Sequence, residues 1–115
     1  MAFERQVIAY KKYFLNFYNA QMDPAQAKIE WTLNLIRVQR HVPEKYFKHM
    51  EGTKGFYEIR VEAGNSIFRI FSFFDKGNLV ILGNAFQNKS PKTPKNEIEK
   101  ILKIKEAYNN EKAEK

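Results

Sequence analysis

The sequence contains no cysteine, which excludes disulfide bonds, a thiol nucleophile and thiolate metal sites. No stretch approaches the roughly 20 consecutive apolar residues of a membrane span, and the first residues lack the apolar run of a signal peptide. The chain has only 5 glycines, no P-loop, no dinucleotide-binding fingerprint and no zinc-ligand spacing. We therefore expect a cytoplasmic protein with no membrane contact, no metal and no small-molecule cofactor.

What the chain does contain is enough apolar material for one domain. Of its 115 residues 43% are hydrophobic and 15% aromatic, which argues against disorder and predicts a single domain over residues 1–115. The polar residues from about 110 to 115 are expected to form a frayed tail. The net charge of +7 favours an acidic partner such as nucleic acid.

Apolar periodicity predicts three helices. Aromatic residues at helical spacing predict the first helix over residues 10–18, preceded by a short strand at residues 5–10. Asp23-Pro24 is expected to cap and begin the second helix, in which Trp31 is expected to pack against the neighbouring helix. Thr93-Pro94 is expected to begin the third.

Alternating apolar residues predict three further strands, at residues 56–62, 67–74 and 79–86. Residues 44–50 are expected to form an irregular turn. If the second hairpin turns at residues 76–77, Arg69 lies opposite Asn84, although a bulged turn shifts this register. The predicted fold is α+β, with the order β-α-α-β-β-β-α and a helical hairpin packed on a small antiparallel sheet.

Two arginines are expected to face each other across the first hairpin. A turn at Gly64-Asn65 pairs Arg60 with Arg69 and places both side chains on one face of the sheet. Like charges directly opposite each other are destabilising, so one interpretation is that an anion, such as a phosphate, binds between them. The other interpretation is that Glu58 and Glu62, on the same face, neutralise the pair as a solvated ladder.

An ordered series of short runs extends these patterns across the second half of the chain. The runs are Lys48-His-Met-Glu-Gly, Gly55-Phe-Tyr-Glu-Ile-Arg60, Phe68-Arg69-Ile-Phe, Phe74-Asp75-Lys-Gly77, Ala85-Phe-Gln-Asn-Lys89 and Lys92-Thr-Pro-Lys95. Together they resemble the RelE/ParE superfamily of toxins, and more narrowly the phage-derived, HigB-like branch of type II toxin–antitoxin systems. The resemblance implies a RelE-like fold and a helix-turn-helix (HigA-like) antitoxin as partner. It also implies either cleavage of mRNA on the ribosome, as in HigB and RelE toxins, or inhibition of DNA gyrase, as in ParE relatives.

The resemblance also implies roles for individual residues. Arg69 corresponds to a basic residue that stabilises transition-state charge, and Arg60 stands where well-known RelE nucleases carry a lysine proposed as general base. Arginine is effectively never deprotonated, so Arg60 is a poor base. The base is then Glu58 or His49, or the protein relies on orientation and charge stabilisation with the ribosome supplying the rest.

The segment after the last predicted strand is expected to contact RNA. Lys89 is the nearest cation to the position of a catalytic arginine in RelE-like nucleases, and Phe86 is the nearest aromatic, although Phe86 fits the core equally well. Gln87, Lys92 and Lys95 complete the expected RNA-binding set.

Three functions remain open from the sequence. The first is a metal-independent mRNA endoribonuclease that acts in translation inhibition, through attack of the ribose 2′-OH on the adjacent phosphate. The second is a ParE-like protein that inhibits DNA gyrase and cleaves nothing. The third is a degenerate toxin kept as an antitoxin-binding module. The missing lysine base leaves room for the second and third.

Overall fold

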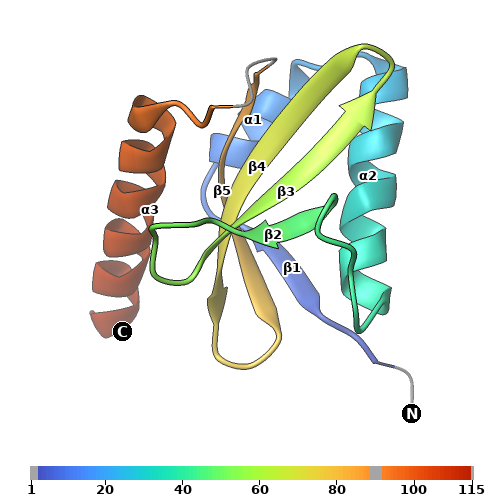
Figure 1. Ribbon diagram of the computed structural model, residues 1–115. Coiled ribbons are helices and arrows are strands. Elements are labelled where there is room, and N and C mark those ends of the chain that lie inside the picture. The colour runs from blue at the N-terminus through green and yellow to red at the C-terminus, as the bar shows by residue number, and fades with distance from the viewer. Residues whose placement is uncertain (1–2, 89–91, 115) are drawn as a thin grey trace.

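The computed structural model describes residues 3–88 and 92–114 as three helices and one five-stranded sheet (Figure 1). The elements in chain order are β1 (Gln6–Ala9), α1 (Tyr13–Asn19), α2 (Asp23–Val38), β2 (Phe47–His49), β3 (Phe56–Ala63), β4 (Ser66–Asp75), β5 (Leu79–Gln87) and α3 (Lys95–Ala113). The predicted α+β class and the order of the predicted elements are confirmed. Within the described residues, no helix is long and apolar enough to cross a membrane.

The sheet has the strand order β1-β5-β4-β3-β2. Strands β3, β4 and β5 form the predicted antiparallel meander. The sheet is mixed, because β1 pairs in parallel with β5 at one edge. At the other edge, Phe47–His49 pair with β3 as a strand, where an irregular turn was expected. The prediction missed this strand because three residues are too short to show an alternating pattern.

The first hairpin has the predicted register. Gly64 adopts a positive φ of 61° at the turn, and Arg60 pairs with Arg69. The register predicted for the second hairpin is wrong, because Arg69 pairs with Phe86 and not with Asn84. A longer turn and an irregularity between Ile70 and Ser72 together shift this pairing.

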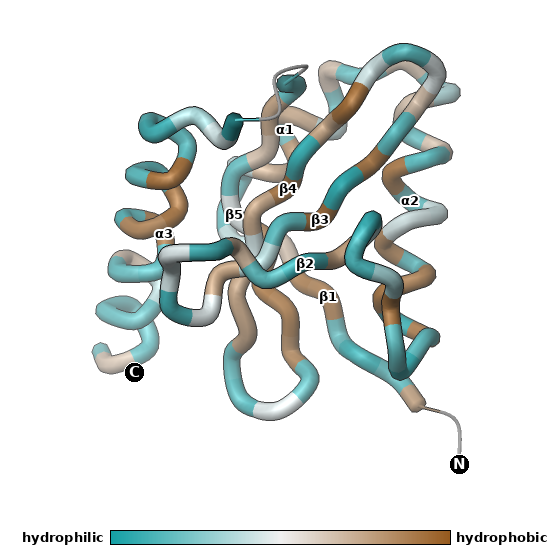
Figure 2. Tube along the Cα trace, viewed as in Figure 1, coloured by the Kyte–Doolittle hydropathy of each residue, from teal (hydrophilic) through white to brown (hydrophobic). Residues whose placement is uncertain are grey.

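Both faces of the sheet carry a hydrophobic core. On one face, Phe14 of α1 and Ile29, Leu33 and Ile36 of α2 pack on strand residues such as Ile59. On the other face, α3 covers part of the sheet, and its residues Ile101 and Ile104 pack on residues of β3, β4 and β5. In Figure 2 the hydrophobic residues of α3 lie on its middle turns. The helix therefore closes one end of the arginine-bearing face and leaves the other end open.

Two details of α2 differ from the prediction. Asp23 is the first helical residue and its side chain caps nothing, because Met22 occupies the cap position. Trp31 is 47% exposed and does not lie between the helices. The buried side of α2 carries Ile29, Thr32, Leu33 and Ile36 and does not include Trp31.

Residues 110–113 of the polar C-terminal segment are helical. Residues 110–115 were expected to fray, but α3 continues to Ala113 and begins one residue after Pro94. Lys112 forms an ion pair with Asp75 at 2.8 Å, and the Tyr10 hydroxyl donates a hydrogen bond to Glu111. These contacts tie the last turns of the helix to the end of β4 and to the residue that follows β1.

Candidate functional site

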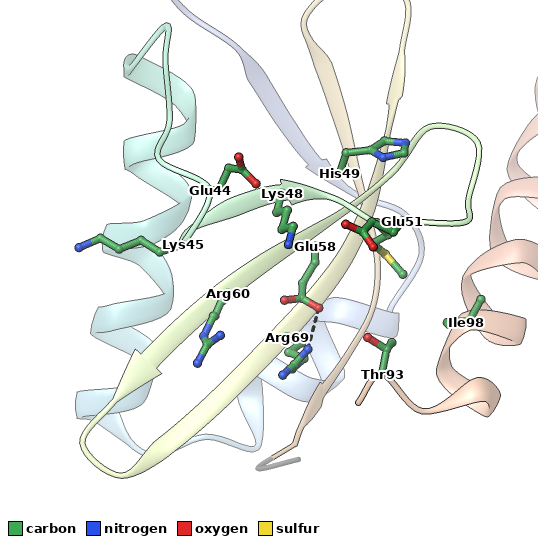
Figure 3. A pocket seen from close by; sticks show the side chains of 11 residues that line it. Glu44, Lys45, Lys48, His49, Glu51, Glu58, Arg60, Arg69, Thr93 and Ile98 are labelled. Atoms are coloured by element: carbon green, nitrogen blue, oxygen red, sulfur yellow. Dashed lines mark hydrogen bonds and ion pairs between the residues drawn. The ribbon is translucent and has the colours of Figure 1, made fainter. Parts of the chain in front are cut away.

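A groove of about 590 Å³ opens on the uncovered end of the arginine-bearing face (Figure 3). Strands β3 and β4 supply its floor, the segment from residue 44 to 51 one wall, and the start of α3 the other. Its lining residues are Glu44, Lys45, Lys48, His49, Met50, Glu51, Glu58, Arg60, Arg69, Thr93 and Ile98. The groove thus brings together four residues that the sequence predicted for the site, Glu58, Arg60, Arg69 and His49.

The floor of the groove holds an enclosed ion pair. Arg69 Nη1 donates to Glu58 Oε1 at 3.0 Å, and the two side chains are only 8% and 16% exposed. They lie on neighbouring strands and share one face of the sheet, as Figure 3 shows. Because the pair is shielded from water, it fixes the Glu58 carboxylate more firmly than a surface pair would.

Arg60 occupies a more open position beside this pair. Its Nε lies 3.2 Å from Glu62 Oε1, and the two side chains are 36% and 64% exposed. Each arginine therefore does contact one of the glutamates, as the ladder interpretation expects. The ladder is solvated only at Arg60 and Glu62, whereas Arg69 and Glu58 are nearly buried. Arg60 is the arginine that an incoming anion can reach.

Lys48 is a site residue that the sequence analysis missed. Strand β2 pairs Lys48 with Glu58, so the lysine projects from the same face as Glu58, and in Figure 3 it extends toward the carboxylate. Lys48 is exposed to solvent. Side-chain alternation along β2 places Lys48 on the groove face, but this alternation can be used only once β2 is known to pair with β3. Glu44, Lys45 and Glu51 lie on the same wall but outside β2, and the sequence analysis missed them too.

His49 faces away from the arginines. It pairs with Tyr57, and strand alternation places both side chains on the sheet face opposite Arg60 and Arg69. The imidazole meets the Tyr57 ring edge-on, with 5.3 Å between ring centroids, and Figure 3 shows the ring turned from the groove floor. His49 lines the groove rim but is poorly placed to take a proton beside Glu58.

Phe86 and Gln87 lie at the end of β5, beside Arg69. Phe86 pairs with Arg69 across the strands and packs edge-on against Phe71, at 5.1 Å between centroids. It is half-buried, so the core interpretation of this ring holds for most of its surface. Gln87 is exposed and donates a hydrogen bond to Ser66 Oγ at 3.2 Å.

The lysine-rich segment is only partly described. Lys89 lies outside the described residues. Lys92 and Lys95 are exposed, and the Lys92 carbonyl accepts a hydrogen bond from Asn88 at 3.0 Å. Because Thr93 lines the groove, these two lysines flank its α3 wall.

The start of α3 is held against the sheet by a buried amide. Asn84 is 5% exposed and donates to the backbone and side-chain oxygens of Glu97, at 3.0 and 2.9 Å. This contact positions the α3 wall of the groove relative to its floor.

The chemistry available in the groove is that of a fixed carboxylate among cations. Glu58 can accept a proton, while Lys48 and Arg60 can stabilise negative charge that develops next to it. In the portion of the chain that the structure describes, no cluster of three or more histidine and acidic side chains could hold a metal ion.

Comparison with known proteins places this site in a family. No curated protein matches the chain significantly. Residues 16–106, which include all of the groove, match the family model described as phage-derived protein Gp49-like (DUF891). The match spans well over half of the 115 residues, and the chain therefore belongs to the Gp49-like family of phage-derived proteins.

Proposed function

We propose that this protein is the toxin of a type II toxin–antitoxin system, of the RelE/HigB-like kind, and that it cleaves mRNA on the ribosome. Family membership supports the toxin class. The observation that carries the nuclease assignment is the Glu58 carboxylate held by Arg69 in an open groove, opposite Lys48 and beside Arg60.

In the proposed reaction Glu58 is the general base. Arg69 binds Oε1 and holds the carboxylate in place, which leaves Oε2 to accept the proton of a ribose 2′-OH. The 2′-oxygen then attacks the adjacent phosphorus. Arginine cannot take this proton, so Arg60 and Arg69 act through charge and position.

Cations beside Glu58 serve the phosphate. As the 2′-oxygen attacks, negative charge grows on the non-bridging phosphate oxygens, and Arg60 is the exposed guanidinium that can bind them. Lys48 donates a proton to the leaving 5′-oxygen, so the P–O5′ bond breaks and a 2′,3′-cyclic phosphate remains. Both steps need only side chains that line the groove.

The proposed partners follow from the same function. The ribosome presents mRNA to the groove, and a helix-turn-helix antitoxin neutralises the protein in the uninduced cell. The net charge of +7 favours binding to the acidic ribosome.

The test is brief expression of the chain followed by mapping of mRNA 5′ ends. We expect new cuts with the parent and a loss of about 10²–10⁴-fold in cleavage rate with Glu58→Gln. Glu99→Gln, on the exposed side of α3, is the matched control and should cut like the parent. Intact mRNA together with gyrase-linked DNA breaks would instead assign the ParE-like function. Intact mRNA without such breaks would leave the antitoxin-binding module.

A further inference from the structure

A pair of aromatic rings, Trp31 and the half-buried Tyr46, lies beyond the rim of the groove. Trp31 is 47% exposed, and Tyr46 meets it edge-on at 5.6 Å between centroids. A lysine ammonium lies over each ring. Lys28 Nζ is 4.1 Å from the Trp31 centroid, and Lys45 Nζ is 5.0 Å from that of Tyr46. Almost half of the Trp31 residue is exposed to water.

This aromatic pair is continuous with the groove. The Tyr46 carbonyl accepts a hydrogen bond from the Arg60 backbone N–H at 2.9 Å, so Tyr46 sits directly beside an arginine of the site. Lys45 lines the groove and also contacts the Tyr46 ring. In Figure 3 the Lys45 side chain extends from the groove wall toward α2, the helix that carries Trp31. Lys45 therefore links the groove wall to the two rings.

We propose that Trp31 and Tyr46 form a stacking platform for an unpaired base of the RNA strand that runs through the groove. The inference deepens the proposed function and rests on it. A base can stack on an aromatic ring whatever its identity, because every base has a π-face. When a base stacks on the rings, Lys28 and Lys45 move off them and bind the flanking phosphates as point charges.

The chemistry of the patch favours RNA over a protein partner. A protein-binding patch is typically depleted of lysine at its centre. Here both rings have a lysine over them, which is the combination of aromatic and basic side chains that binds single-stranded nucleic acid. The platform would hold the substrate strand outside the groove and help set which phosphate reaches Glu58.

Trp31 is the only tryptophan, so its fluorescence reports on the platform directly. The probe is a single-stranded RNA of about twelve nucleotides, within typical site sizes for such strands, with 2′-O-methyl groups that prevent cleavage. A fluorescein on its 5′ end gives binding by anisotropy in the same titration. Inorganic polyphosphate serves as the probe without bases.

We expect the RNA to quench Trp31 fluorescence and polyphosphate to leave it nearly unchanged. Trp31→Ala should weaken RNA binding by about 5- to 150-fold, and Trp31→Phe should retain most of the affinity because a ring remains. Val38→Ala is the matched control, since Val38 is 49% exposed on the same helix, and should bind like the parent.

The two proposals fail separately. Equal binding by parent and Trp31→Ala, or RNA binding without quenching, would overturn the platform and leave mRNA cleavage untouched. Quenching and binding in a protein that cuts no mRNA would support the platform and count against the nuclease. No RNA binding at all would overturn the platform, and a change of Trp31 fluorescence only with a protein partner would reassign the patch to protein contact.

Discussion

Arg69→Ala should break the ion pair on the groove floor and thereby lower both the stability and the activity of the protein. The substitution leaves the Glu58 carboxylate, which is only 16% exposed, without its ion-pair partner. Breaking an enclosed pair in this way typically costs about 3–5 kcal/mol. We take the lower value, about 3 kcal/mol, because Glu58 can still reach water in the groove.

That loss is measurable as a change in Tm. With an unfolding entropy of about 2.1 cal/mol/K per residue, about 3 kcal/mol lowers the Tm of a 115-residue chain by roughly 12 °C. Thermal unfolding followed by circular dichroism gives the value. Cleavage of ribosome-bound mRNA should be measured well below the lowered Tm, and we expect it to fall by about 10²-fold or more, since Glu58 is no longer held.

A second substitution separates the ion pair from simple loss of packing. Glu58→Gln in the Arg69→Ala background removes the stranded charge, so the double variant should be about 1–2 kcal/mol more stable than Arg69→Ala alone. It should remain inactive. A double variant less stable than Arg69→Ala, or an Arg69→Ala protein that melts like the parent and cuts mRNA, would refute this account of the floor.

Three further changes test other parts of the molecule. Hydrogen bonding by Lys112 lowers the pKa of Asp75, so this contact stabilises the fold at neutral pH, and the stabilisation is lost as pH falls through the lowered pKa. Asp75→Asn should therefore lower Tm at pH 7, by an amount that shrinks below about pH 4. Gly83→Ala should destabilise the fold by about 1–3 kcal/mol in urea unfolding, because a Cβ there meets Ile101 Cδ1, and Ile101→Val should recover part of the loss. Lys95→Ala should reduce the log–log salt slope of RNA binding by roughly one, and an unchanged slope would return Lys95 to a solvated role.

The sequence predicted what depends on local pattern. The alternating runs and the Gly64 turn were enough to place Arg60 opposite Arg69, because a tight hairpin fixes its own register. The second hairpin was misplaced because its register depends on the longer turn and on the irregularity between Ile70 and Ser72. A shift of this kind leaves the alternation of apolar residues almost intact and so gives no local signal.

The rest of the site depends on which elements pack together. The sequence named Glu58, Arg60 and Arg69, but Lys48 joins them only because a three-residue strand pairs with β3. His49 looked equally eligible until that same pairing turned its ring to the opposite face. Neighbouring residues on a strand point to opposite faces of the sheet. When a strand is missed, sequence reasoning therefore cannot tell which of two neighbouring residues faces the site.

The charge balance inside the groove bears on the proposed binding of RNA. The basic lining residues Lys45, Lys48, Arg60 and Arg69 are offset by the acidic residues Glu44, Glu51 and Glu58. Such a lining exerts little long-range attraction on a phosphate, although the chain as a whole carries +7. Under the proposed function, we therefore expect affinity for RNA to come mainly from outside the groove, from the exposed lysines at the start of α3 and from the rings beside α2. If the protein cleaves mRNA as proposed, we expect it to bind a free strand weakly and to cut efficiently only when another body, such as the ribosome, holds the strand in position.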